Sequence, residues 1–247
     1  TRVVRLQGDT PAYTAAQVVP NDKGAEILWR APTGQSTYAV YMDSAQAKRH
    51  AAMPSGRWEA ADTSYRGDTY AVTFRDGYIQ GVYGGEPWQK LVSNLGVSSK
   101  DTGWFNEMGE VESFTVVSDG PVCTQIRVKK KLSGNHFYDK LYTLFPDHFV
   151  VSITDHDRFG NLSRMHIIPD GTYLADKGLT AAVDGKGDAE GIAGKNIKPL
   201  WYVISGKGWA VANVAVTPYS NMTYWDGGNK AAVGFEVHHF GQAAVAL

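Results

Sequence analysis

Five Asp-Gly steps punctuate this chain of 247 residues, at Asp76-Gly77, Asp119-Gly120, Asp170-Gly171, Asp184-Gly185 and Asp226-Gly227. Asp-Gly is a preferred pair for the two-residue turn of a β-hairpin, because that turn needs positive φ angles that glycine adopts without a steric clash. Apolar runs that alternate or are rich in aromatic residues flank two of these steps, TYAVTFR and YIQGVYGG around the first and SFTVVS and PVCTQIRVKKKL around the second. The sequence therefore predicts an all-β fold of antiparallel sheet, a class that leaves the function open.

Composition excludes two classes of partner. Lys and Arg number 24 against 25 Asp and Glu, a net charge of -1, so the chain offers no field for a nucleic-acid backbone. The longest apolar stretches, such as 149–153 and 210–216, are far shorter than the ~20 residues of a membrane helix. We expect a soluble protein with no nucleic-acid partner and no membrane span.

Cys123 is the single cysteine, which excludes a disulfide framework and a cluster of thiolate ligands. Its place in an apolar strand predicts a buried, unreactive thiol. The sequons Asn161-Leu162-Ser163 and Asn221-Met222-Thr223 suit a secreted, periplasmic or cell-surface protein. The start at Thr1 and the end within the apolar run AAVAL are typical of a segment of a longer protein.

Two β units are expected along the chain. Two β-rich runs at 25–30 and 37–42 predict a hairpin with a longer loop, which joins the strand VVRL in an N-terminal β module over residues 1–43. A linker over 44–62 holds a short helix near 45–52, ended by Pro54. Residues 63–247 form the main β-sandwich, for which we expect truncation at the C-terminus.

The main domain has three further features to test. Residues 87–95 predict one or two helical turns, with Pro87 at the first helical position and Gly96 as the stop. In the strand after Pro121, alternation places Val122, Thr124, Ile126 and Val128 toward the core and Gln125, Arg127, Lys129 and Lys131 toward solvent. The segment 136–145 pairs with 149–154; the same counting buries Phe137, Leu141 and Phe145 and leaves His136, Tyr138, Lys140 and Tyr142 on a face that lines a groove.

The turn Gly120-Pro121-Val122 with IRVKKKL, followed by YDKLYTLFPDHFVVSITDHD, resembles the middle strands of galactose-mutarotase-like β-supersandwich domains. The segment AEILWRAPTGQSTYAVYMD looks like the β-sandwich module that precedes such a domain in rhamnogalacturonan exolyase-like and related carbohydrate-active proteins. The resemblance implies a curved sandwich whose concave face binds a sugar or polysaccharide. It also implies a His acid and a Glu base near the C-terminal end, a region that here contains Glu236 and His238.

Lyase or epimerase chemistry removes a proton next to a carboxylate and needs a base, an acid and a cation. The candidates are His136 and His238 as base or acid, Tyr138 as proton donor and Arg127 as carboxylate anchor. Glu236 shares a strand face with His238, so these two form an acid–base pair or an ordinary surface pair. The group around His136 is equally compatible with a solvated strand face.

Sugar binding uses flat aromatic faces beside polar groups. Candidate substrate-binding residues in or beside turn-rich segments are Trp88, Trp104, Tyr224 and Trp225, with His166 added from the run SRMHIIP. The alternatives are aromatic lids at the ends of the sandwich and a histidine at the edge of the core.

No cofactor and no metal site are expected. Successive residues of Asp155-His156-Asp157 diverge on a strand, and Lys186 interrupts the acidic group Asp184, Asp188 and Glu190. The sequence thus predicts a carbohydrate-active domain that binds or cleaves an acidic polysaccharide or oligosaccharide by metal-independent lyase or epimerase chemistry. The alternative is a non-catalytic β module of a surface or fibrous assembly, with self-association or additional domains.

Overall fold

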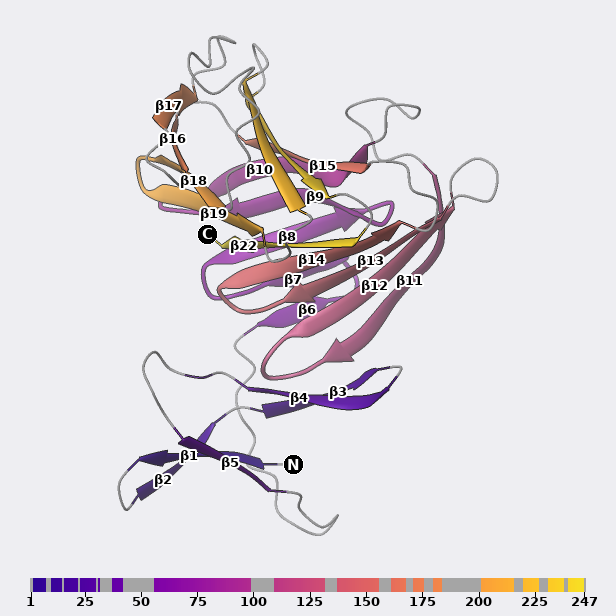
Figure 1. Cartoon of the computed structure of the whole chain (residues 1–247), viewed down its shortest axis with the longest axis vertical. Helices are drawn as coiled ribbons and strands as arrows, with labels where there is room; N and C mark the ends of the chain where they lie inside the picture. Colours follow the sequence, from indigo (N-terminus) through magenta and orange to yellow (C-terminus); the bar gives the residue numbers. More distant parts are fainter. Residues whose placement is uncertain are drawn as a thin grey trace.

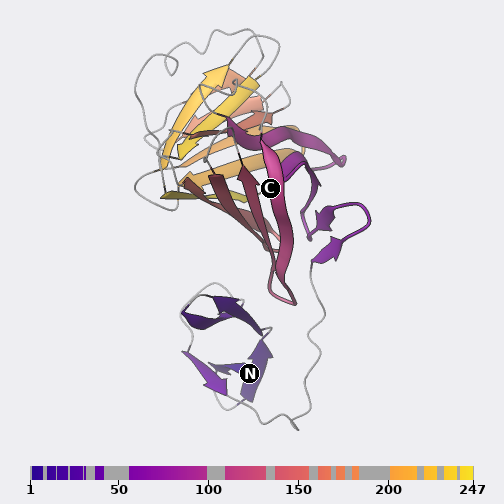
Figure 2. The same ribbon diagram turned by 90° about the vertical axis from the view of Figure 1, so that its right-hand side faces the viewer.

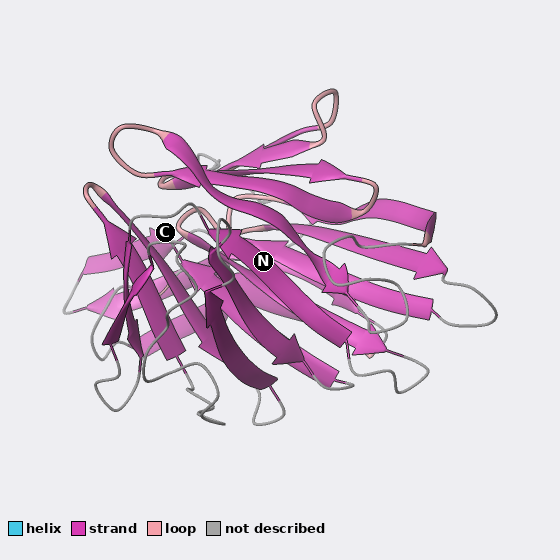
Figure 3. Ribbon diagram, turned by 90° about the horizontal axis from the view of Figure 1, so that it is seen from above, coloured by secondary structure: helices cyan, strands magenta, loops and turns pink. Residues whose placement is uncertain are grey.

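The chain folds, in a computed structural model, into two large antiparallel sheets packed as a β-sandwich, preceded by shorter strands (Figures 1 and 2). The structure describes residues 2–7, 10–14, 16–21, 23–29, 31, 37–41, 56–98, 109–131, 137–155, 161–167, 171–175, 180–183, 201–215, 220–226, 231–237 and 240–246. Within these ranges the regular elements are strands, without a helix (Figure 3). The predicted all-β, antiparallel sandwich class is confirmed.

The first large sheet has eight strands, here called the eight-stranded sheet. Its spatial order is β20 (Ser220–Asp226), β21 (Ala231–Val237), β15 (Asn161–Ile167), β10 (Gln89–Ser98), β9 (Tyr78–Gly84), β8 (Tyr70–Arg75), β7 (Ser64–Arg66) and β6 (Arg57–Glu59). Along the chain, the first strand of this sheet is β6, which lies inside the segment 44–62 that was expected to be a linker.

The second large sheet has nine strands, here called the nine-stranded sheet. Its order is β11 (Glu110–Asp119), β12 (Thr124–Lys131), β13 (Phe137–Leu144), β14 (His148–Asp155), β22 (Phe240–Ala246), β19 (Trp209–Ala215), β18 (Trp201–Gly206), β16 (Gly171–Ala175) and β17 (Thr180–Val183). The final strand β22 lies between β14 and β19, so the last described residues are integral to the sheet.

The N-terminal strands form two small sheets. One has the order β2 (Thr10–Thr14), β1 (Arg2–Gln7), β5 (Thr37–Tyr41); the other pairs β3 (Ala16–Asn21) with β4 (Gly24–Trp29). The predicted hairpin between 25–30 and 37–42 is wrong, because β4 pairs with β3 and β5 with β1. Gly24, the first residue of β4, has a φ of 135° and lies opposite Asn21, so the chain turns back onto β3 over a short connection.

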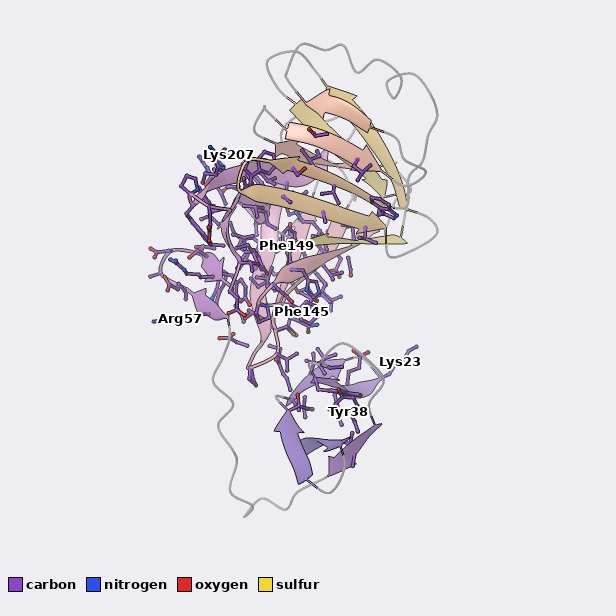
Figure 4. The ribbon with its side chains drawn as sticks, turned by 90° about the vertical axis from the view of Figure 1, so that its left-hand side faces the viewer. Lys23, Tyr38, Arg57, Phe145, Phe149 and Lys207 are labelled. Carbon is purple, nitrogen blue, oxygen red and sulfur yellow. The ribbon has the colours of Figure 1, made fainter. Side chains whose placement is uncertain are left out.

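The core lies between the two large sheets. Val72, Val82 and Val92 of the eight-stranded sheet are fully buried, as are Ile126 and Leu144 of the other. Aromatic rings join the layers, with ring centroids 5.2 Å apart for Phe74 and Tyr142 and 5.7 Å apart for Tyr70 and Phe149. Figure 4 shows Phe149 within the sandwich and Arg57 at its margin. This burial is the main stabilising term of the fold.

Tyr70 also ties the sheets together through its hydroxyl. That group donates to the carbonyls of Phe145 and His148 at 2.7 and 2.9 Å, holding the turn between β13 and β14. Burial raises the pKa of Tyr70 well above its usual value, so the hydroxyl keeps its proton for these bonds. The predicted pairing of 136–145 with 149–154 is confirmed by the β13–β14 register.

Two predictions about local structure fail. Residues 87–95 are a turn followed by β10, not a helix. Leu91, Val92 and Leu95 are all buried at a spacing that fits a helix, but a bulge near Leu91 brings them to the core from a strand. The expected helix at 45–52 lies outside the described residues.

The second failure is the orientation of β13. Lys140 and Tyr142 are 1% exposed and face the core, whereas Phe137, Leu141 and Phe145 are only half-buried. The register explains this, because Lys140 lies opposite Val128 and Tyr142 opposite Ile126, both core residues of β12. The predicted faces of β12 hold, except that Gln125 is also buried, 3.3 Å from the Thr143 hydroxyl.

The hairpin predictions are confirmed at the best-flanked turns. Asp76 and Gly77 have φ of 48° and 77° and join β8 to β9, as a two-residue turn with two positive φ angles requires. The hairpin β11–β12 also forms, but across a longer connection after Asp119. Asp184-Gly185, Asp170 and Gly227 lie outside the described residues.

Candidate functional site

The structure describes three of the five predicted catalytic residues, Arg127, Tyr138 and Glu236. His136 and His238 lie outside the described residues, and Glu236 and Tyr138 are placed by their backbones alone. Tyr138 lies opposite Lys130 in β12 and so belongs to the core-facing side of the sheet. Arg127 is exposed on the other side of the same sheet. The backbone positions of Arg127 and Tyr138 therefore belong to opposite faces of the β12–β13 pair.

Arg127 already has a carboxylate partner. Its Nε donates to Asp139 Oδ1 at 2.9 Å and its Nη2 to Oδ2 at 2.6 Å, a bidentate pair. An incoming substrate carboxylate would have to displace Asp139. This geometry favours a structural pair over a substrate anchor.

Lys140 and Lys130 bind the protein's own backbone instead of lining a groove. Lys130 Nζ donates to the carbonyl of Asp76 at 2.7 Å, and Lys140 Nζ donates to that of Gly77 at 2.9 Å. Both lysines are buried, so these bonds meet part of the requirement that a buried charged group be hydrogen-bonded. The two ammonium groups fix the β8–β9 turn against the nine-stranded sheet.

A different surface gathers the groups expected of a binding site. We call it the outward face, meaning the face of the eight-stranded sheet that is turned away from the core. Its first row crosses four strands through directly opposed residues, in the order Arg66, Ala71, Tyr83 and Lys90. Directly opposed residues of antiparallel strands share one face, and the neighbouring row of Tyr65, Val72 and Val82 is buried in the core.

Two aromatic rings on or beside this row carry a cation. The Arg66 guanidinium lies 5.3 Å from the ring centroid of Trp88, and the Lys90 ammonium lies 6.0 Å from that of Tyr83. Both separations are within the range of cation–π attraction. Trp88, in the turn before β10, is 46% exposed, so much of its surface remains open to a ligand.

Gly81 lets the second pair lie flat. A Cβ atom there would come within 2.9 Å of both Lys90 Cε and Tyr83 Cε2, closer than real side-chain contacts allow. The lysine stem and the tyrosine ring therefore lie over the β9 backbone, where a larger residue would displace them. The result is a flat surface of ring, aliphatic stem and charge.

The charge on the outward face differs from that of the chain as a whole. Arg57 and Arg66 are directly opposed across β6 and β7, an unfavourable arrangement for like charges. A neighbouring carboxylate, Glu59, lies 3.8 Å from Arg57 Nε, in a pair whose arginine side chain is 81% exposed. Lys90 adds a third cation to this face, three strands from Arg66 in the same row.

Several predicted residues fall on the same face farther along the sheet. His166 lies opposite Ser93 and Ala232, and Trp225 lies opposite Ala232, so all of them belong to one cross-strand row. Glu236 lies opposite Leu162 of β15. Leu162 is four residues from His166 on that strand, so alternation places the backbone positions of Leu162 and Glu236 on the same face as His166. Tyr224 belongs to the opposite face, and Trp104 lies outside the described residues.

Sequence reasoning missed Arg66, Tyr83 and Lys90. The signal was the alternation of the strands at 70–75 and 78–84, which separates core valines from polar and small residues. Lys90 was missed because it lies within residues 87–95, which were wrongly predicted to be helical and not a strand.

Cys123 behaves as expected. It is 1% exposed, and burial, with a smaller effect of Asp119, raises the pKa of its thiol to about 11. Within the described residues no group of three or more His, Cys, Asp or Glu side chains is arranged to hold a metal ion, and no helix is long and apolar enough to cross a membrane.

Comparison with known proteins gives no family assignment. No protein-family model matches the chain, and no curated protein sequence matches it significantly.

Proposed function

We propose that this chain is a carbohydrate-active β-sandwich domain that binds an acidic polysaccharide on the outward face of its eight-stranded sheet. The observation that carries the proposal is the exposed Trp88 ring with the Arg66 guanidinium 5.3 Å from its centroid, next to the Tyr83–Lys90 pair. The resemblance to mutarotase-like supersandwich domains supports the same class of ligand.

The chemistry of this cluster matches an acidic sugar. An aromatic ring packs against the C–H face of a pyranose, while a guanidinium or ammonium beside it binds a carboxylate. Arg66 and Arg57 repel each other in the free protein, and a bound anion would relieve that repulsion. A neutral ligand would leave it in place, so an acidic glycan is favoured. A polysaccharide ligand also fits an exported protein with the sequons noted above.

Binding without cleavage is the better-supported form of this function. Arg127, the candidate carboxylate anchor, is exposed on one face of the nine-stranded sheet and is paired with Asp139, whereas the backbone position of Tyr138, the candidate proton donor, belongs to the other face. Lyase or epimerase chemistry through these two residues would require Arg127 to exchange Asp139 for the substrate carboxylate. A non-catalytic module within a larger surface assembly is the corresponding alternative to an enzyme.

A glycan panel tests the proposal, with Trp201 as a matched control. Trp201 is 39% exposed but belongs to the nine-stranded sheet. We expect Trp88→Ala and Arg66→Ala each to weaken binding of acidic glycans about tenfold, and Trp201→Ala to change it less than about twofold. Binding should weaken as salt is raised, because exposed charges are screened.

Two results would overturn the proposal. One is the absence of binding to every acidic glycan of the panel, and the other is equal binding by Trp88→Ala and the wild type. Ultraviolet absorbance of the same mixtures reports unsaturated sugar ends, and their appearance would restore the lyase function.

A further inference from the structure

The two cations of the outward face lie at different levels along the strands. Arg66 and Lys90 start from one cross-strand row, but their charged ends leave it in opposite directions. The Arg66 guanidinium approaches the ring of Trp88, which stands in the turn beyond the end of β9. The Lys90 side chain extends the other way, toward Gly81.

The glycine at position 81 fixes where Lys90 and Tyr83 end. A Cβ atom at Gly81 would come within 2.9 Å of Lys90 Cε and 3.1 Å of the Tyr83 hydroxyl oxygen. Both side chains therefore reach two residues along β9 from their own row, and both are half-buried. A glycine inside a strand is typical of a place where a ligand approaches the backbone closely.

The separation of the two cations along the strands follows from these positions. From Gly81 to Gly84, the last residue of β9, the strand rises by three residues, ~10 Å. On the neighbouring strand β8, Tyr83 and Gly81 face Ala71 and Thr73, which are half-buried and uncharged. Neither is bulky, so a flat ligand can lie along this part of the sheet between the two charges.

Resting on the proposed function, we propose that the acidic glycan lies along β9 and that Arg66 and Lys90 bind the carboxylates of two sugar units with one unit between them. The separation of ~10 Å is longer than one pyranose unit and close to the length of two. Alternate units of an extended β-1,4-linked chain are turned over, so the first and third units present their carboxylates to the same side.

The ligand class is therefore an extended β-1,4-linked uronate chain, and a trimer is the shortest chain that binds both cations. The second carboxylate of a trimer binds within the complex already formed by the first, which raises the affinity without a second association step. Further units extend beyond the two cations and should add little.

Calorimetric titration of the whole chain with β-1,4-linked oligoglucuronates of one to six units tests this arrangement. The dissociation constant of the wild type should fall about tenfold from dimer to trimer and less than about twofold from trimer to hexamer. Neutral cello-oligosaccharides of the same lengths should show no such step, because they carry no carboxylates.

Two variants should remove the step. Lys90→Gln loses the second charge, and Gly81→Ala displaces the ends of Lys90 and Tyr83, so in each the dimer and the trimer should differ by less than about twofold. Lys129→Gln is the matched control, because Lys129 is an exposed lysine of the other large sheet and its loss should keep the tenfold step. A thermal melt of each variant checks that folding is retained.

The length dependence separates this proposal from the one on which it rests. If Lys90→Gln keeps the tenfold step, or if the wild type shows none, Lys90 does not bind a second carboxylate, and the proposed function stands as long as Trp88→Ala weakens binding. If another acidic glycan binds and no oligoglucuronate does, the ligand class inferred here is wrong and the proposed function again stands. If Trp88→Ala binds every acidic glycan as the wild type does, both proposals fail.

Discussion

Lys140 is a charged side chain that serves as a core residue. Its stem lies in the core-facing row of β13, and its ammonium donates to the Gly77 carbonyl at 2.9 Å. It is 1% exposed, so losing the side chain would leave both a cavity and a buried carbonyl without this donor. Lys130 repeats the arrangement at the neighbouring carbonyl of Asp76. Two lysines of a strand pair thereby hold one turn of the opposing sheet.

We expect Lys140→Ala to lower the free energy of unfolding by ~2–5 kcal/mol, the range for large-to-small substitutions in a core. Lys140→Met keeps most of the volume and loses the hydrogen bond, so its cost should be ~1–3 kcal/mol. Lys129→Ala, at an exposed position of β12, should change stability by less than ~0.5 kcal/mol. Urea denaturation measures all three. Equal midpoints for Lys140→Ala and Lys129→Ala would show that Lys140 contributes nothing to the core.

The face on which a single residue lies can be predicted from the sequence where the polarity of the side chain agrees with the alternation of the strand. Alternation placed Ile126 and Val128 in the core and Arg127 in solvent, as the structure has them. It failed at Lys140 because this buried lysine donates to the carbonyl of Gly77, in a turn distant in sequence, and no local pattern records that partner.

At the scale of elements, the β8–β9 hairpin depends on a glycine that satisfies two conditions. Gly77 has a φ of 77°, and a Cβ atom there would come within 2.7 Å of Val128 Cγ1 in the opposing sheet. The positive φ follows from the two-residue turn and is predicted by the Asp-Gly pair in the sequence. The second arises only from the packing of the sheets.

Gly77→Ala should therefore destabilise the protein by about 2–4 kcal/mol, through backbone strain together with overpacking against Val128. Asp76→Gly is the control, because Asp76 has a φ of 48° that glycine adopts more easily. Its contact with Arg75, 3.5 Å long between exposed side chains, contributes little. Thermal unfolding should show a large shift for the first variant and almost none for the second. A small shift for Gly77→Ala would mean that the turn is free to move away from β12.

Strand β10 shows why one element was mistaken for a helix. Buried residues at positions 91, 92 and 95 repeat with the period of a helix, yet the bulged strand presents all three to the core. The same strand carries Lys90 and Ser93 on the outward face, so the error hid part of the candidate site. Bulges are set by pairing with β9 and β15, which the local sequence does not specify.

For the whole molecule, the Asp-Gly turns predicted the pairing of β8 with β9 and of β11 with β12, but not the order of the sheets. The contacts β10–β15 and β14–β22 join strands far apart in sequence, and no turn motif encodes them. The outward face consists of residues from the eight strands of such a sheet, which is why it could not be assembled from the sequence. The same holds for the contact between the N-terminal strands and the sandwich.

That contact centres on Gln17 of β3, which is 7% exposed. Its Oε1 accepts from the backbone N–H groups of Cys123 and Val122 at 2.9 and 3.2 Å, and its Nε2 donates to the Ser118 hydroxyl at 2.6 Å. A Cβ atom at Gly120 would come within 2.7 Å of the Gln17 side chain, so the turn after β11 fits closely around it. Figure 1 shows β3 beside this end of the nine-stranded sheet.

Gln17→Ala removes the acceptor from two buried N–H groups, at an expected cost of ~1–3 kcal/mol to the docking of the N-terminal strands. The amides of Val122 and Cys123 should then exchange with deuterium about fivefold to 150-fold faster, since that range of free energy corresponds to a change of this size in the open population. Gln17→Glu keeps an acceptor oxygen in place, and the Ser118 hydroxyl can turn to donate to it, so protection should be largely retained. The amide of Ile126, within the β12–β13 pair, is the internal reference and should be unchanged in both variants. If Val122 and Cys123 remain protected in Gln17→Ala, the sandwich shields them by itself, and Gln17 is not what attaches the N-terminal strands to it.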